Sequence, residues 1–430
     1  MERSFSAHEA LMVGSGMRVV AVSEIDGELD EGTLEYAARH LADRHPILRG
    51  AFTGEPGFPR LTVPDPGARA TAGSRSEPAT PYLHRVADLS GELDAPTRWD
   101  TGPLFRIALV REGGAAGANT ATGRNAANYV VMTMPRACVD GMSYLALLRE
   151  FWSTYTEACA GRKSPAVPVQ PILPPPLDDI ILDKYSQADL QAYVEGRAKE
   201  DALNPPAHLP TPAAVGTSPG PTAEFDSIRV GLDASETNRL ADAARARSLS
   251  LNSLMCGILA TAMRPALEPA AGTVTVTCAL AADLRRRLTP PIPDDRVQSA
   301  ASGCPIRLDV DADPDPFQVA AQMSERLRDN LQAGNAEREI AAFSRLVDHC
   351  PPTFVVTNLG RVPRPPLPGH NRFVSLRLLP LAHMPVPFVV LTRLEGGLDI
   401  DFPFSRAWYD ERQIDEIAAE ARRVIAGITA

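Results

Sequence analysis

The chain has 430 residues, with 43 lysines and arginines against 53 aspartates and glutamates, so its formal net charge is −10. This length suggests two or three domains, and a hydrophobic content of 44% with 22% charged residues is ordinary for a folded protein. An acidic chain without a dense basic patch lacks the long-range attraction to phosphate that nucleic-acid binding needs, so nucleic acid is excluded as a partner. No apolar run approaches the ~20 residues of a membrane span, and the N-terminus has no secretory signal, which predicts a cytoplasmic protein.

The cysteines give no sign of a disulfide framework or a metal site. They are scattered, without C-x-x-C pairs and without histidines at metal-ligand spacing. They therefore read as reduced, buried thiols, and no cofactor is expected. The six are Cys138, Cys159, Cys256, Cys278, Cys304 and Cys350.

The first half of the chain predicts helices and strands in mixed order. Apolar spacing predicts a helix over residues 29–45, which a proline ends because it disfavours helical geometry in the residue before it. Partial alternation over 47–52 predicts a strand, and a third element, 104–110, also reads as a strand. A buried strand over 129–134 runs through a tight loop, 135–141, into a helix marked by apolar residues at a period of 3.6.

The second half continues the mixed pattern, which favours an α+β fold over a Rossmann pattern. A helix at 187–200 lies within Pro-rich sequence, so we expect domains at 1–175 and 224–430 joined by a connection, 176–223. Ser235 is predicted to cap one helix. The remaining predicted helices cover 235–248, 252–263, 316–332 and 411–427, and the predicted strands cover 224–232, 274–280, 354–357, 373–379, 386–393 and 397–402.

The tight loop carries a family resemblance. Residues 135–141 read PRACVDG, which resembles the H-H-x-x-x-D-G motif of the condensation-domain superfamily with both histidines replaced. That superfamily includes chloramphenicol acetyltransferase, plant BAHD acyltransferases, nonribosomal peptide condensation domains and polyketide-associated (Pap-type) acyltransferases, and the Pap-type enzymes are the most similar. Further similar segments are SFSAHEALM, LEYAARHLADRHPILRGAF, WDTGPLFRIALV, LADAARARSLSLNSLMCGILATA, CALAADLRRRLTPPIP and VVTNLGRV.

The resemblance implies an architecture and a structural ion pair. It implies two chloramphenicol-acetyltransferase-like lobes in a V-shaped pseudo-dimer, with a central substrate tunnel in which donor and acceptor meet at residues 135–141. It also implies that Asp140 pairs with an arginine of the other lobe, for which Arg285 is the first candidate and Arg287 the second. Gly141 would leave space for the substrate.

Arg136 stands where the resemblance places the base of acyl transfer. A guanidinium stays protonated in proteins, so it cannot accept the acceptor's proton. It can donate several hydrogen bonds to a carbonyl or carboxylate. The residue is thus either part of a decayed loop that reaches solvent or a binder and oxyanion donor in a repurposed site, with Arg136, Asp140 and Gly141 as catalytic candidates.

Further residues are candidates for contact with the substrate. Pro135 replaces the first histidine of the motif, and Cys138 would be a nucleophile if it were exposed beside the guanidinium. His8 and His383 lie in segments that the resemblance brings to the tunnel, where either could supply the missing base. Asn358, in VVTNLG, completes this set.

Three functions remain open from the sequence. The first is acyl transfer, in polyketide or peptide natural-product biosynthesis, from an acyl or peptidyl carrier protein or a CoA thioester to a hydroxyl or amine, since positioning alone can supply large rate effects. The second is a repurposed cyclase, isomerase or pericyclase that uses Arg136 as a hydrogen-bond donor. The third is a non-catalytic module that binds a carrier protein or recruits a partner enzyme.

Overall fold

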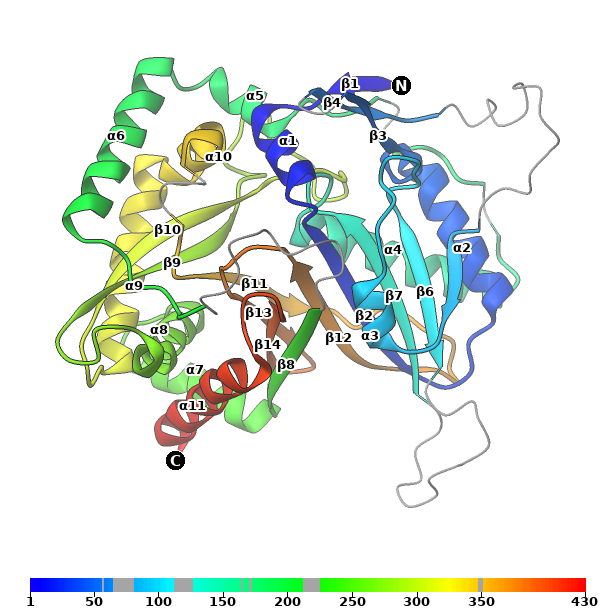
Figure 1. The fold of residues 1–430 in the computed structure, drawn as a ribbon. Coiled ribbons are helices and arrows are strands. Elements are labelled where there is room, and N and C mark those ends of the chain that lie inside the picture. The colour runs from blue at the N-terminus through cyan, green and yellow to red at the C-terminus, as the bar shows by residue number, and fades with distance from the viewer. Residues whose placement is uncertain are drawn as a thin grey trace. The chain divides into compact units, whose positions relative to one another are not determined.

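The strand that carries the motif, β7 (Ala127–Pro135), lies inside a mixed sheet ordered β12-β2-β7-β6-β5. The computed structural model describes the chain except residues 56–57, 65–80, 112–126, 164, 170–171, 212–224 and 347–350. Within the described residues, two compact units separate. Unit 1 comprises Met1–Pro176, Ile292–Ser299 and Pro363–Leu381, and unit 2 comprises Leu177–Pro291, Ala300–Val362 and Ala382–Ala430 (Figure 1).

Unit 1 is built around this sheet, whose inner strands are largely buried because the sequence is apolar on both faces. Its other strands are β2 (Arg18–Asp26), β5 (Leu83–Val86), β6 (Arg106–Arg111) and β12 (Arg372–Leu381). A small separate sheet is ordered β1-β4-β3 and consists of β1 (Glu2–Ser4), β4 (Phe58–Thr62) and β3 (Ala51–Glu55). The helices are α1 (Ala7–Gly14), α2 (Glu31–Arg44), α3 (Leu89–Asp94) and α4 (Gly141–Cys159), with a 3-10 turn η1 at Pro46–Arg49.

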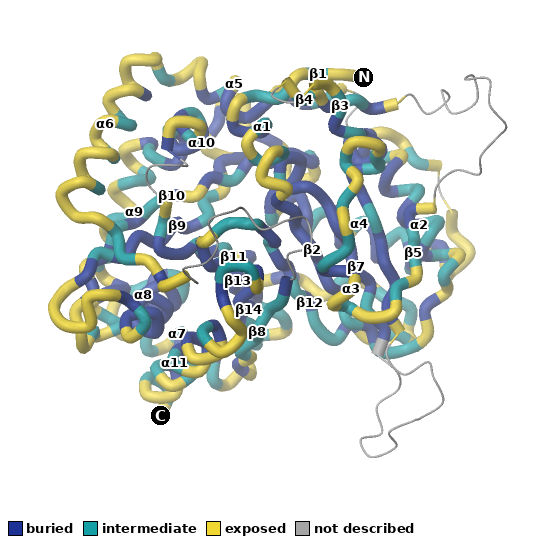
Figure 2. Tube along the Cα trace, viewed as in Figure 1, coloured by how far each residue is buried: buried dark blue, intermediate teal, exposed yellow. Residues whose placement is uncertain are grey.

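Helices α2 and α4 pack on each other and bury the apolar faces that their periodicity predicts. Phe151, Trp152 and Tyr155 of α4 are fully buried and meet edge to face, an arrangement that aromatic rings prefer. Trp152 also contacts Phe373 of β12 in the same geometry. Figure 2 shows the resulting dark core of unit 1 beneath its exposed helix surfaces.

Unit 2 contains a second sheet, ordered β10-β9-β11-β13-β14-β8, in which β11 runs parallel to both neighbours. The strands are β8 (Phe225–Leu232), β9 (Val274–Asp283), β10 (Ala301–Val310), β11 (Phe354–Val362), β13 (Phe388–Leu394) and β14 (Gly397–Ser405). The helices are α5 (Leu177–Leu182), α6 (Gln187–Leu203), α7 (Ala234–Arg245), α8 (Leu251–Met263), α9 (Pro316–Ala333), α10 (Asn335–Leu346) and α11 (Glu411–Thr429), with a 3-10 turn η3 at Arg264–Ala266. Within the described residues, no helix has the length and apolar character of a membrane span.

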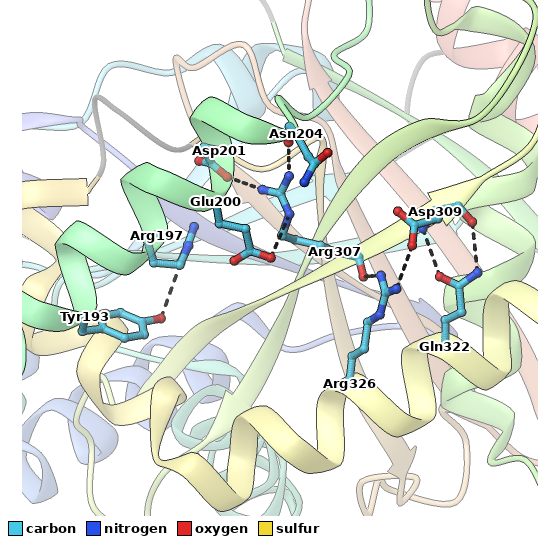
Figure 3. A network of polar contacts seen from close by, with 9 residues as sticks. All are labelled: Tyr193, Arg197, Glu200, Asp201, Asn204, Arg307, Asp309, Gln322 and Arg326. Carbon is cyan, nitrogen blue, oxygen red and sulfur yellow. Dashed lines mark hydrogen bonds and ion pairs between the residues drawn. The ribbon is translucent and has the colours of Figure 1, made fainter.

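Polar side chains connect helix α6 to β10 of unit 2, as Figure 3 shows. Arg307 of β10 lies in ion pairs with Glu200, at 3.2 Å, and with Asp201 of α6. Tyr193 donates its hydroxyl hydrogen to Glu339 of α10 at 2.6 Å. Leu190 is the one fully buried hydrophobic side chain among the described residues of this helix. Tyr193 and Val194 are partly buried and pack against buried residues of α10, so the polar contacts add to a narrow apolar face.

Most predicted elements are present, with two local corrections. Residues 47–49, predicted as the start of a strand, form the 3-10 turn η1, because the proline before them fixes φ at a helical value, and the strand begins at Ala51. The cap of α7 is Asp233 and not Ser235. Asp233 forms a capping box with Glu236, which satisfies two free N–H groups and so displaces the start of the helix.

Four long elements were not predicted from the sequence: α1, β2, β10 and α10. The exchange of segments between units was also missed, because nothing in the sequence says that β12 pairs with β2, about 350 positions earlier. The units therefore do not coincide with the ranges 1–175, 176–223 and 224–430. The assignment of those three ranges as functional domains stays a prediction.

Candidate functional site

The loop 135–141 is a tight turn between β7 and α4. Pro135 ends the strand opposite Arg18 of β2 and is buried. The turn closes when Cys138 donates its N–H to the Pro135 carbonyl at 3.1 Å and Val139 donates to Arg136 at 3.4 Å. The chain then extends through Asp140 and enters α4 at Gly141. A strand, a turn and a helix start thus fix the loop from both ends.

Asp140 is the N-cap of α4. Its carboxylate accepts the backbone N–H of Ser143 at 2.7 Å and lies 2.8 Å from the Ser143 hydroxyl. The side chain is buried, with 2% of its surface exposed. Since an N-cap carboxylate also meets the positive end of the helix dipole, Asp140 has a structural role that is independent of any partner in unit 2.

The side chain of Arg136 is directed into the protein and not into solvent. Its backbone N–H donates to Met17 at 2.9 Å, while its Nη1 donates to the Val139 carbonyl at 3.0 Å and to the Ser299 hydroxyl at 2.5 Å. Burial lowers the pKa of Arg136, and the charge of Asp140 opposes that shift. The guanidinium remains a cation at neutral pH. These contacts hold the guanidinium inside the protein, and its role toward a substrate stays a prediction.

The segment Ile292–Ser299 completes this part of unit 1. The Ser143 hydroxyl lies 2.8 Å from the Gln298 carbonyl, and the Gln298 N–H donates back to it at 3.2 Å. The Gln298 side chain donates to the Pro175 carbonyl at 2.8 Å. Ser143, Gln298 and Ser299 were missed from the sequence, because no local pattern relates a serine at a helix start to a loop 155 positions later.

His8 and Cys138 also belong to unit 1. Burial first, and then the charge of Arg136, lower the pKa of His8 to about 3, so the imidazole is neutral at physiological pH. Glu9 of the same helix forms two contacts with Arg3, at 2.6 and 2.7 Å. Burial and then the charge of Glu9 raise the pKa of the Cys138 thiol. A buried, protonated thiol does not support the nucleophile interpretation of Cys138.

The other predicted site residues lie in unit 2. Asn358 is exposed at a bulge of β11, accepts the Gly360 N–H and donates to Asn252 of α8, both at 2.8 Å. The ring of His383 lies 4.8 Å from that of Phe225. Neither contact is one that would activate a catalytic base. The roles of Asn358 and His383 toward a substrate stay predictions.

The two arginines proposed as partners of Asp140 have different surroundings within unit 2. Arg285 is completely buried, and its backbone N–H donates to Asp283 at 3.0 Å. Arg287 lies 3.1 Å from the buried carboxylate of Glu337 and donates to the Leu331 carbonyl. The Arg285 side chain also lies near a carboxylate, because its Nε is 3.9 Å from Asp283. Arg285 stays the first candidate and Arg287 the second, and the ion pair with Asp140 stays a prediction.

A pocket of about 550 Å³ lies in unit 2 at the start of α8. Arginines and serines line it, with leucines and a glutamine of α9 completing the wall, and no acidic side chain is among the lining residues. Ser250 caps α8 by accepting the Ser253 N–H at 2.9 Å, so the positive end of the helix dipole faces this region. The polar lining consists of Ser250, Ser253, Arg287, Ser324, Arg328 and Gln332. Charge and donors together suit an anion.

Across the part of the chain that the structure describes, no group of three or more His, Cys, Asp or Glu side chains could hold a metal ion. The candidate donors of the site are instead a guanidinium, hydroxyls and a neutral imidazole. Such a set binds and polarises oxygen atoms, and it holds no strong base at neutral pH.

Two models of known protein families match this chain. The model of the condensation domain matches residues 3–268, more than half of the chain. This chain belongs to the condensation-domain family. The C-terminal model of phthiocerol/phthiodiolone dimycocerosyl transferase matches residues 221–399 of the same protein. No sequence among the curated proteins is significantly similar to it.

Solved structures share the fold of this condensation-family protein over nearly its whole length. Polyketide synthase associated protein 5 from Mycobacterium tuberculosis is 16% identical with a TM-score of 0.72, covering 99% of this chain and 98% of that one. A trichothecene 15-O-acetyltransferase from Fusarium sporotrichioides is 11% identical with a TM-score of 0.75, at 99% and 95% coverage. The X-domain from teicoplanin biosynthesis is 18% identical with a TM-score of 0.65, at 99% and 94% coverage.

These similarities confirm the predicted fold class, an α+β fold of two chloramphenicol-acetyltransferase-like lobes. The condensation-family protein thus resembles the acyltransferases and condensation domains that the sequence motif indicated. The V-shaped arrangement, the tunnel and the roles of the motif residues stay predictions.

Proposed function

We propose that this condensation-family protein transfers an acyl group from a thioester to a hydroxyl or amine of a polyketide- or peptide-like acceptor, without a histidine base. The observation that carries the proposal is Arg136, which replaces the base yet is oriented by Val139 and Ser299 at the end of β7. The similar proteins support the reaction class, since one of them is an O-acetyltransferase and another is associated with polyketide synthase.

In this reaction the acceptor oxygen or nitrogen attacks the thioester carbonyl, the new C–O or C–N bond forms, and the C–S bond breaks. Arg136 donates hydrogen bonds to the carbonyl oxygen as negative charge develops there. The proton of the acceptor goes to the leaving sulfur, whose thiol form has a pKa of about 8.5 and therefore retains the proton at neutral pH. His8 is neutral, and burial and the cation beside it disfavour its protonation, so it is a poor acceptor for this proton.

The pocket at the start of α8 supports a donor that carries phosphate. A CoA thioester and the phosphopantetheine arm of a carrier protein both present phosphate groups, which arginines and a helix N-terminus bind well. Arg287 and Arg328 are the charged residues of this pocket. A carrier protein or CoA is accordingly the proposed donor, and its acyl chain is the proposed small-molecule substrate.

Substitutions at Arg136 test the proposal with acyl-CoA and carrier-bound thioesters, using mass spectrometry to follow the acylated acceptor. Arg136→Ala should lower turnover by ~10²-fold or more, as the loss of one oxyanion donor does. Arg136→Lys should lose much of the activity because a point charge does not replace a planar fork of donors. A gain of simple acyl transfer in Arg136→His would support the reaction class, since that change restores a base. Wild-type turnover in Arg136→Ala would overturn the assignment.

A second candidate is a cyclisation or isomerisation of a polyketide-like chain. One observation favours it: the site combines a fixed cation with a neutral histidine, which suits polarisation of a substrate carbonyl in a rearrangement that needs no base. Liquid chromatography before the same mass-spectrometric assay distinguishes it. An isomerised product keeps the mass of its substrate but elutes at a different time, whereas an acylated acceptor gains the mass of the acyl group. A protein that changes neither substrate would instead favour the partner-recruiting interpretation.

A further inference from the structure

Ser299 contacts Arg136 from a segment more than 160 positions away. Its side chain is buried, with 7% exposed, and its Oγ lies 2.5 Å from Nη1 of Arg136. A guanidinium has only hydrogen-bond donors, so the direction of this bond is fixed: arginine donates and the serine oxygen accepts. The hydroxyl hydrogen of Ser299 is therefore not used in this bond, which is the one hydrogen bond of the Ser299 hydroxyl among the described residues.

Two acceptors engage the same nitrogen of Arg136. Nη1 donates to the Val139 carbonyl at 3.0 Å and to Ser299. Because the guanidinium is planar, these two bonds fix its plane as well as its position. Ser299 is itself held in place, since the preceding residue, Gln298, is bound through its backbone to Ser143.

We propose that Ser299 and Arg136 form a two-donor site for one carbonyl or carboxylate oxygen of the substrate. This inference rests on the proposed function. A hydroxyl that accepts a hydrogen bond from a cation becomes a stronger donor, because successive hydrogen bonds polarise one another. Ser299 thus has two effects: its oxygen orients Arg136, and its hydrogen adds a second bond to the substrate oxygen. Preorganised donors of this kind stabilise the charge that develops in acyl transfer.

The test uses a thioester whose carbonyl can be observed directly: the S-octanoyl thioester of N-acetylcysteamine, with ¹³C at the carbonyl carbon. Infrared spectroscopy records the carbonyl band of this probe free and bound, and titration gives its affinity. The wild-type protein should shift the bound band to lower frequency. Ser299→Ala should lose part of that shift and bind about tenfold more weakly, as expected for a hydrogen bond to a polarised group. Ser299→Thr, which keeps the hydroxyl, should restore both.

The control is Ser23→Ala, which removes a hydroxyl that is buried in β2 and has no hydrogen-bond partner among the described residues. It should leave the band and the affinity unchanged. Ser299→Cys, which keeps the size of the side chain, replaces Ser299→Ala if the alanine variant does not fold. A shift that depends on Arg136 but is the same in Ser299→Ala and wild type overturns this inference alone. A wild-type protein that does not shift the band, or an unchanged shift in Arg136→Met, overturns the proposed function and this inference with it.

Discussion

The side chain of Ser143 and the backbone of Gln298 contact each other at two points although 155 positions separate them. The serine hydroxyl lies 2.8 Å from the Gln298 carbonyl and accepts the Gln298 N–H at 3.2 Å. The same hydroxyl lies 2.8 Å from the carboxylate of Asp140, the cap of α4. The start of the helix, the motif loop and the segment that carries Ser299 therefore share one buried polar network.

Ser143→Ala should remove this connection. The Gln298 carbonyl and N–H would remain buried with one partner fewer, which costs about 1–3 kcal/mol of unfolding free energy. Urea unfolding measures that loss, and hydrogen exchange should show faster exchange of the Gln298 N–H. Ser23→Ala is the matched control, because its hydroxyl has no partner among the described residues. Equal losses in the two variants would contradict a special role for Ser143.

Asp140 variants separate its two proposed roles by magnitude. As an N-cap alone, its replacement by alanine should cost about 1 kcal/mol. If Asp140 also pairs with the buried Arg285, the loss should be about 3–5 kcal/mol, since the partner's charge is left buried and uncompensated. Asp140→Asn keeps a capping acceptor but removes the charge, which also acts on Arg136. The single variant therefore reports on both arginines, and a double variant is needed to isolate the pair with Arg285.

The double variant Asp140→Asn, Arg285→Met provides the control for that pair. Where two residues interact, the effects of their substitutions are not additive. We expect the double variant to be more stable than the sum of the single losses predicts. Additive losses, or an Asp140→Asn variant as stable as the wild type, would show that Asp140 and Arg285 do not form this ion pair. The same cycle with Arg287→Met would then test the second candidate.

The motif region shows how far sequence reasoning reaches. The β-branched run before Pro135 and the 3.6-residue spacing after Gly141 are local signals, and both elements, β7 and α4, are present. Asp140 at the start of an apolar helix is likewise a local capping signal, but it was interpreted only as an ion-pair partner, and its capping role was missed. The orientation of Arg136 depends on Ser299, and a hydrogen bond across 163 positions leaves no trace in local sequence.

The missed strand β2 has a similar explanation. Its residues, Arg18–Asp26, form a continuous buried run without strict alternation, because both faces of the sheet are covered. Periodicity alone cannot distinguish such a run from a buried helix. The pairing of β2 with β12 depends on long-range contacts, so the sequence predicted β12 as a strand but could not assign it to unit 1.

Gly257 should be essential to the packing of α8 on α9. A Cβ at this position would lie 2.4 Å from the Pro316 carbonyl oxygen and 2.8 Å from the Ala320 nitrogen, and backbone atoms cannot easily move away. Gly257→Ala should therefore lower the unfolding free energy by about 1–3 kcal/mol, as overpacking does. Urea unfolding is the measurement.

Gly196 of α6 is the matched control for Gly257. A Cβ there meets nothing within 4 Å. Gly196→Ala should increase stability by up to ~1 kcal/mol, because alanine loses less backbone entropy than glycine on forming a helix. Effects of the same sign in the two variants would be inconsistent with this account of α8 and α9.

His8 should make the protein less stable as the pH falls. Burial and the charge of Arg136 hold its pKa at about 3, against an ordinary value of 6.5. Between these values the unfolded chain binds a proton that the native state does not, so stability rises with pH over this range. The loss is about 1.4 kcal/mol per pH unit, or about 2 kcal/mol at pH 5 relative to pH 7. His8→Gln should reduce the difference between the unfolding free energies at pH 5 and pH 7. If the wild type and the variant showed the same difference, the role of His8 in this pH dependence would be refuted.

Arg328→Ala should weaken binding of CoA thioesters without weakening that of phosphate-free ones. Arg328 lines the pocket at the start of α8, and its side chain is 61% exposed, so its removal should not disturb folding. An exposed ion pair contributes up to ~1 kcal/mol, which corresponds to an affinity loss of about three- to fivefold that shrinks as salt is added.

Octanoyl-CoA and the octanoyl thioester of N-acetylcysteamine are titrated side by side. Arg412→Ala, which removes the same charge from an 84% exposed position on α11, is the control and should change neither affinity. If Arg328→Ala weakened both ligands equally, or neither, the pocket would not be the phosphate site, because only CoA carries phosphate.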